Sequence, residues 1–206
     1  MLSDDRGIAD AMYTMLSVAI VMIMAIAISG VVMSTTMKQG TDANAKIAAY
    51  DTGGMIKGAC ALYFTIDSAN SDFAATDPDK ITLKSSAGER VDETISFSRA
   101  SAPSYIPASD GCVIWSGYVC VPADGTYVFR LTSRDGSWLW IDGNLTIDDH
   151  GVHALQTVNS NGIALTKGYH LVKVRYFYRD LSTASCTLCW NAGKSGNMET
   201  VSALYR

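Results

Sequence analysis

Residues Asp135–Gly151 read DGSWLWIDGNLTIDDHG, and this stretch decides the fold because two short alternating runs flank one turn. The turn is Asp-Gly-Asn at Asp142–Asn144, where Asp and Asn hydrogen-bond their own backbone and Gly accepts a positive φ. Trp138 and Trp140 are two residues apart, so in a strand they lie on the same face. The stretch therefore predicts an antiparallel β-hairpin.

The chain on both sides of this hairpin shows the same alternation. The runs CVIWSGYVCV, GTYVFRLTS and YHLVKVRYFY start at Cys112, Gly125 and Tyr169. Each of them is expected to bury one face and to leave the other to solvent. A second turn, PADG at Pro122–Gly125, is also expected to close a hairpin. Together these runs predict an antiparallel β-sandwich or barrel over residues 57–206.

The beginning of the chain differs, because residues Ala11–Met37 contain no charged side chain. A helix needs about 20 apolar residues to cross a bilayer, so this run is long enough to span one. The polar segment that follows keeps helix-forming residues up to Gly53 and Gly54. We therefore expect a mainly β protein with a long N-terminal hydrophobic α-helix over residues 8–56. This helix would enter a membrane or the core of a filament.

Charge and composition exclude some functions. The 206 residues carry a formal net charge of −4, whereas nucleic-acid-binding proteins normally have a basic stripe that neutralises phosphates. His150 and His153 form H-x-x-H, but no nearby carboxylate or thiol completes a ligand set at zinc spacing. His153 and His170 are expected to be structural. Because the sequence also lacks a nucleophile, base and oxyanion constellation, we expect no nucleic-acid partner, no enzymatic activity, and no resident metal or cofactor.

The chain has five cysteines, which suggests an external location, although an odd number leaves at least one unpaired. Cys112 and Cys120 fall in one predicted strand, whose ends lie about 26 Å apart at about 3.3 Å per residue, too far for a bridge. Any disulfide must therefore cross between strands, and the candidate pairings join Cys112 or Cys120 to Cys186 or Cys189. The sequence leaves its connectivity open.

Asn144 begins an N-x-[ST] sequence, NLT. It falls in the predicted turn, which should face solvent, and a secreted protein can be glycosylated at such a place. Chance occurrence of this pattern is common, so glycosylated and unmodified Asn144 both stay open.

Several motifs occur together in one order. They are ACALYF from Ala59, DETISF from Asp92, VIWSGYV, PADGTYVFRLTSRDGSWLWIDGNLTIDDHGVH, LTKGYHLVKVRYFY, LCW and the closing ALYR. In this series the chain resembles the protective-antigen lectin-like domain over roughly Lys57–Arg206. The resemblance implies a β-sandwich-like barrel that binds carbohydrate or serves as a recognition and spacer module.

In the sugar-binding adhesins of that family, two successive Asp residues joined by a cis peptide hold calcium, and the calcium binds sugar hydroxyls. The matching position here is Arg134-Asp135. An arginine in place of the first carboxylate removes an oxygen ligand and repels a divalent ion, so calcium is not expected. Asp148 and Asp149 form a second acidic pair, which fits either backbone caps in a turn or a metal site.

The two tryptophans of the hairpin also allow two interpretations. If they are exposed, Trp138 and Trp140 offer a platform on which a sugar ring can stack. Large aromatic side chains are mostly well buried, however, which favours packing under a loop. The candidate ligand-binding residues are Asp135, Trp138, Trp140, Asp148 and Asp149.

The N-terminal part is similar to archaeal type IV pilin-like proteins, in which a peptidase removes a short charged leader in front of the apolar helix. Arg6 and Gly7 before Ile8 match that boundary. The resemblance implies a leader over residues 1–7, a cut between Gly7 and Ile8, and assembly of copies of the chain through the helix.

Two functions follow from these expectations. In the first, the chain is a subunit of a surface filament, in which the helices bundle and the β domain is displayed as an adhesive, carbohydrate-binding domain. In the second, it is a single-pass membrane-anchored carbohydrate-recognition module that does not polymerise. Both place the β domain at the cell surface with glycans as partners, and they differ in whether the helix leaves the bilayer.

Overall fold

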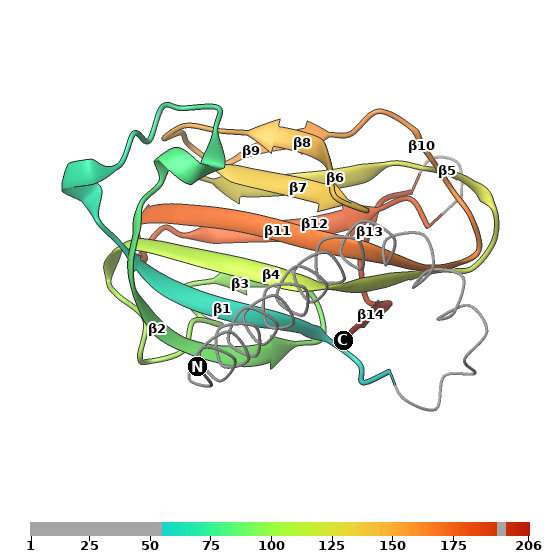
Figure 1. The fold of residues 1–206 in the computed structure, drawn as a ribbon, viewed down its shortest axis with the longest axis horizontal. Coiled ribbons are helices and arrows are strands. Elements are labelled where there is room, and N and C mark those ends of the chain that lie inside the picture. The colour runs from blue at the N-terminus through green and yellow to red at the C-terminus, as the bar shows by residue number, and fades with distance from the viewer. Residues whose placement is uncertain (1–54, 193–196) are drawn as a thin grey trace, which may run out of the picture. The chain divides into compact units, whose positions relative to one another are not determined.

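The computed structural model describes residues 55–192 and 197–206, which form a β domain with antiparallel strands in facing layers (Figure 1). Two short 3-10 turns, η1 and η2, lie in the connection between the first two strands, at Ser68–Asn70 and Pro78–Lys80. This architecture confirms the predicted antiparallel β class. The strands are β1 Ala59–Ile66, β2 Leu83–Asp92, β3 Ser96–Ser98, β4 Ser109–Val121, β5 Gly125–Tyr127, β6 Phe129–Arg134, β7 Ser137–Ile141, β8 Asn144–Asp149, β9 Gln156–Asn159, β10 Ile163–Leu165, β11 Gly168–Asp180, β12 Ser185–Trp190, β13 Glu199–Thr200 and β14 Leu204–Tyr205.

The long strands β4 and β11 lie at the centre of the larger sheet and pair along almost their whole length. The strand order of this sheet is β2-β1-β4-β11-β7-β8, and β14 pairs with the part of β4 that β1 does not reach. The facing sheet has the order β13-β12-β6-β9, with β3 paired to β12, and β10 pairs with β5 in a small sheet of their own. Strand β8 is therefore one edge of the larger sheet, and β9 is one edge of the facing sheet.

The two predicted turns have different outcomes. The hairpin at Asp142–Asn144 is confirmed, because β7 and β8 pair antiparallel on either side of it. The hairpin predicted at Pro122–Gly125 is wrong, because β4 pairs with β1, β11 and β14 whereas β5 pairs with β10. This turn leads the chain from one sheet into another. Turn residues favour a local change of direction, but they do not determine which strand becomes the partner.

The main core lies between the sheets and follows the two-residue period of the strands. On β4, Val113, Trp115 and Val119 point into it with 0% of their surface exposed. The alternate positions of β4 point to the outer face of the larger sheet, where Cys112 belongs to a second apolar cluster and Ile114 packs against it. Both faces of the central strands are therefore apolar, and part of the outer face needs a cover.

Residues 67–82, which connect β1 to β2, supply this cover and are here called the covering loop. The indole Nε1 of Trp138 donates to the carbonyl of Thr76 at 3.0 Å. The guanidinium of Arg175 donates from Nη1 to the Asp79 carboxylate at 2.9 Å and from Nη2 to a backbone carbonyl of the loop at 2.6 Å. These bonds hold the covering loop over the second cluster.

The structure contains none of the candidate disulfides between β4 and β12, and all five cysteines are free thiols. The directions of the side chains give the reason. Cys112 lies in the outer cluster of the larger sheet, and Cys120 shares its face by the strand period. Cys186 belongs to the core between the sheets, and Cys189 points away from that core on the far side of the facing sheet. No pairing of a β4 cysteine with a β12 cysteine brings the two sulfurs onto one face.

The predicted leader, the Gly7–Ile8 cleavage position and nearly all of the predicted helix over residues 8–56 lie outside the described residues. Within residues 55–192 and 197–206, no helix is long and apolar enough to cross a bilayer.

Candidate functional site

The β7–β8 hairpin is held rigidly by Asp142 at its tip. Asp142 and Gly143 adopt positive φ values of 49° and 81°, the left-handed conformation that Asp and Gly tolerate best. The backbone N–H of Asp142 donates to the Leu171 carbonyl at 2.9 Å, and its Oδ1 accepts the Leu171 N–H at 2.9 Å. Its Oδ2 lies 2.7 Å from Nδ1 of His170. The backbone and the side chain of Asp142 therefore both attach the hairpin tip to β11.

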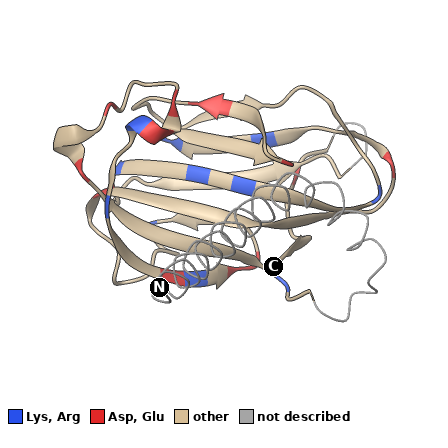
Figure 2. Cartoon of the chain, in the orientation of Figure 1, with Lys and Arg blue, Asp and Glu red and all other residues tan. Residues whose placement is uncertain are grey.

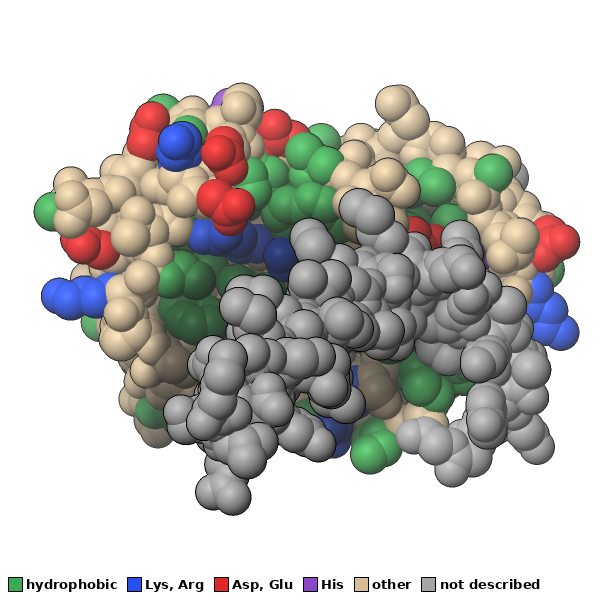
Figure 3. All heavy atoms as spheres, in the orientation of Figure 1, with side chains coloured by type: hydrophobic (Ala, Val, Ile, Leu, Met, Phe, Trp, Pro, Cys, Tyr) green, Lys and Arg blue, Asp and Glu red, His purple; other side chains and the backbone are tan. Residues whose placement is uncertain are grey.

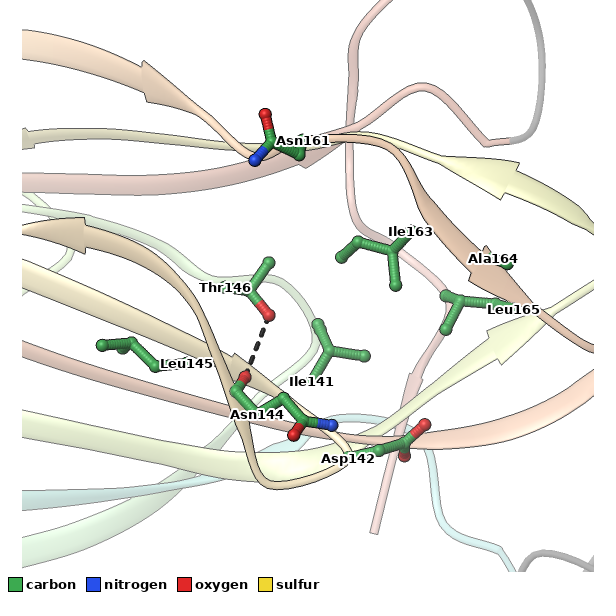
Figure 4. Close-up of a pocket in the computed structure, with 9 residues that line it drawn as sticks. All are labelled: Ile141, Asp142, Asn144, Leu145, Thr146, Asn161, Ile163, Ala164 and Leu165. Carbon is green, nitrogen blue, oxygen red and sulfur yellow. Dashed lines mark hydrogen bonds between the residues drawn. The ribbon is translucent and has the colours of Figure 1, made fainter.

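A pocket of about 330 Å³ lies between this hairpin and the segment that contains β10 (Figure 4). We call it the edge pocket, because β8 and β9 are the edges of their sheets on this side. Its volume is at the lower end of the range of about 300–1,000 Å³ that small-molecule sites occupy. It is lined by Ile141, Asp142, Asn144, Leu145, Thr146, Asn161, Ile163, Ala164 and Leu165.

The lining of the edge pocket combines an apolar floor with polar groups at its rim. Ile141 and Leu165 are buried and Ile163 is half-buried, whereas Asn144 and Asn161 are exposed. Within the described part of the chain, neither of these asparagines makes a side-chain hydrogen bond, although the Asn144 carbonyl accepts one from Thr146 at 3.0 Å. Two amides with both donors and acceptors are thus available beside an apolar surface. This combination suits a ligand that has hydroxyl groups on one side and C–H groups on the other.

The tryptophans share one face of β7, as predicted, but that face does not form an exposed platform. Trp138 has 0% of its surface exposed and lies in the cluster under the covering loop. Trp140 is half-buried at the border of this cluster, and Nζ of Lys173 lies 5.1 Å from the centroid of its ring. Trp138 therefore packs and cannot stack on a ligand, which leaves Trp140 as the accessible ring of the pair.

Asp135 is 5% exposed and has a positive φ of 64°. Its Oδ2 accepts the backbone N–H of Arg179 at 3.0 Å, and its own N–H donates to the His153 carbonyl at 3.1 Å. The carboxylate thus caps the backbone at the β6–β7 turn. The peptide bond between Arg134 and Asp135 is trans, as are the others in the ranges that the structure describes.

The carboxylates of the second acidic pair, Asp148 and Asp149, point in different directions. Asp149 is 3% exposed, and its carboxylate accepts hydrogen bonds from Ser133 Oγ at 2.9 Å and from the Gln156 amide. Burial, with the nearby Asp149 charge, raises the pKa of the Cys186 thiol above its ordinary value. Asp148 is exposed and lies 3.0 Å from Nδ1 of His150. The two carboxylates therefore have separate partners, and neither Asp149 nor Asp135 is free to face a ligand.

The described residues contain no group of three or more His, Cys, Asp or Glu side chains that is arranged to hold a metal ion. Asp135 accepts a hydrogen bond from a backbone N–H and Asp149 accepts one from a hydroxyl, as is usual for buried carboxylates.

The edge pocket includes residues that the sequence did not single out. Asn161 lies just before β10 and Leu165 is the last residue of β10, a strand that pairs with β5 and lies far along the chain from the hairpin. Of the predicted site, only the NLT sequence at Asn144 lies in the pocket.

A family profile for the PA14 domain matches residues 63–200. The chain belongs to the PA14 domain family. This match covers most of the described β domain, including the hairpin and the edge pocket. No protein of curated function matches the chain.

Several solved structures share the PA14 fold of this chain. The anti-sigma factor domain-containing protein from Clostridium clariflavum is 28% identical with a TM-score of 0.59, and the match covers 76% of this chain and 50% of that one. The chain thus spans about half the length of that protein. The PA14 domain of the MpAFP antifreeze protein is 17% identical with a TM-score of 0.59, over 75% of this chain and 93% of that one. The Epithelial Adhesin 9 A domain from Candida glabrata, solved with Galb1-4GlcNAc, is 13% identical with a TM-score of 0.54, over 76% of this chain and 92% of that one.

Proposed function

We propose that this chain is a cell-surface adhesion protein whose PA14 domain binds carbohydrate at the edge pocket. The observation that carries the proposal is the pair of available amides, Asn144 and Asn161, above a floor of aliphatic side chains. Sugars present hydroxyl groups that amides can bind in both directions, and C–H faces that aliphatic side chains can cover. The solved complex of the Candida glabrata adhesin domain with a disaccharide supports carbohydrate as the ligand class. The proposed role is binding without catalysis.

We further propose that this binding does not need calcium. At the position that matches the calcium site of the family's sugar-binding adhesins, Arg134 brings a positive charge, and the Asp135 carboxylate accepts a hydrogen bond from the Arg179 N–H. A calcium ion needs about six to eight oxygen ligands. The edge pocket lies on a different part of the domain and offers amide groups instead.

A glycan screen with the full-length chain tests this proposal. We expect binding to a defined set of neutral or charged oligosaccharides, and we expect Asn161→Ala to weaken it about fivefold, the effect of one lost hydrogen bond. Asn197→Ala is the matched control, because Asn197 is also exposed but does not line the pocket. The proposal would be contradicted if the chain binds no glycan, or if both variants lose glycan affinity equally.

The apolar run Ala11–Met37 supports two ways of displaying the domain. In the first, which we favour, copies of the helix bundle into a filament, helped by small residues such as Ala25, Ala27 and Gly30 that let helices approach closely. In the second, the helix stays in the bilayer as a single-pass anchor. The apolar run on which both modes depend lies outside the described residues.

The intact mass of the chain purified from its native envelope distinguishes these two modes. If the chain is a processed filament subunit, we expect a mass that begins at Ile8. A mass that retains Met1 to Gly7 would contradict processing and favour the anchor. The same spectrum reports whether Asn144 carries a glycan, which would lie at the rim of the edge pocket.

A further inference from the structure

A second hollow lies on the outer face of the larger sheet, beside the β7–β8 hairpin. It has a volume of about 230 Å³ and is lined by Trp140, Gly143, Leu171 and Lys173. Figure 3 shows hydrophobic side chains next to basic ones on this face, and Figure 2 shows that the basic residues sit in the middle of β11. We call this the outer hollow. It is separate from the edge pocket, with which it shares none of its four residues.

The outer hollow combines an aromatic ring with a cation. Trp140 and Lys173 are directly opposite each other on β7 and β11, and Nζ of Lys173 lies 5.1 Å from the Trp140 ring centroid. Leu171 is 40% exposed and extends the apolar surface. Gly143 has no side chain, and among the residues that the structure describes no atom beyond its chain neighbours lies within 4 Å of the place where a Cβ would stand, so these residues leave the approach over the hairpin tip open.

The charge of Lys173 is not neutralised within the part of the chain that the structure describes, where no carboxylate lies within ion-pair distance of it. Arg175, two residues further on the same face, is different because it is buried and bound to Asp79. The two basic residues of β11 therefore have separate roles: Arg175 holds the covering loop, and Lys173 is exposed beside an aromatic ring.

We propose that the outer hollow binds an acidic sugar residue, one that carries a carboxylate or a sulfate. The proposal rests on the proposed function, since it specifies which glycans this domain selects. The C–H face of the sugar packs on the Trp140 ring, which supplies apolar area. The acidic group pairs with the Lys173 ammonium, which then exchanges its contact with the ring for an ion pair. An uncharged sugar gains only the first of these contacts.

Binding of three probes to the full-length chain tests the selectivity: methyl glucuronide, glucose 6-sulfate and methyl glucoside. Each is titrated while the indole N–H signals of the protein are followed by NMR. We expect both acidic probes, or one of them, to bind about fivefold more tightly than the neutral one and to lose this advantage at high salt. A preference for only the glucuronide or only the sulfate identifies the acidic group.

Three variants locate the effect. Lys173→Gln should abolish the preference for acidic probes, and Trp140→Leu should weaken the binding of all three probes at this site. Lys84→Gln is the matched control, because Lys84 is an exposed lysine on β2 outside the hollow. Equal binding of acidic and neutral probes, or a preference that survives Lys173→Gln, overturns this inference. If the neutral probe still binds and responds to Asn161→Ala, the proposed function stands while this inference fails. Absence of binding by every probe overturns this inference, and absence of binding in the glycan screen as well overturns the proposed function.

Discussion

Replacing Trp138 by alanine is expected to lower the free energy of unfolding by about 3–5 kcal/mol, the usual cost of deleting a buried large aromatic side chain. Its indole is fully buried, packs near Phe177 with 6.1 Å between ring centroids, and donates to the Thr76 carbonyl. The deletion leaves a cavity under the covering loop and an unpaired carbonyl in it. Urea unfolding of the full-length chain, followed by near-ultraviolet circular dichroism, measures the loss.

Trp140→Ala is the control for this prediction. Trp140 occupies the same face of the same strand, but it is only half-buried. Removing the Trp140 side chain should therefore lower the free energy of unfolding clearly less than removing that of Trp138, because less apolar area returns to water. Equal losses in the two variants would mean that the covering loop does not bury Trp138 in solution.

The second large effect is expected at Asp135. Asp135→Ala should lower the free energy of unfolding by about 2–4 kcal/mol, since it removes a hydrogen bond to a charged group and places alanine in the left-handed region. The carboxylate accepts the Arg179 N–H at 3.0 Å, and φ is 64°. Thermal unfolding of the full-length chain checks the size of the loss, both with calcium and with a chelator.

Asp135→Asn separates the two causes, because asparagine tolerates the left-handed conformation and keeps an acceptor oxygen. We expect it to retain most of the stability that Asp135→Ala loses. We also expect each variant to show the same loss with calcium as with a chelator. A wild-type chain that calcium stabilises, with this gain lost in Asp135→Asn, would show that Asp135 is a metal ligand and not a backbone cap.

The sequence was sufficient for the β class and for the hairpin, because both depend on local patterns. Alternation in WLWI places Trp138 and Trp140 on one face, and Asp-Gly-Asn closes a turn with positive φ at Asp142 and Gly143. The local pattern does not indicate which of the two tryptophans is buried. It depends on the covering loop, which comes from a part of the chain about sixty residues earlier and is held by Arg175.

The errors have a common physical cause, which is strand pairing between distant segments. The Pro122–Gly125 turn was expected to close a hairpin, but β5 pairs with β10. The candidate disulfides would need β4 and β12 cysteines that face each other, whereas these strands belong to different sheets. The edge pocket was missed for the same reason, since β10 meets the hairpin only in the folded domain.

The most direct test of the central claim is equilibrium binding of the strongest glycan from the screen, measured by calorimetry with calcium and with a chelator. The account predicts that the full-length chain binds with the same affinity in both conditions, and that Asn161→Ala weakens binding in both. Binding that appears only with calcium, or that is unchanged by Asn161→Ala, would contradict recognition at the edge pocket.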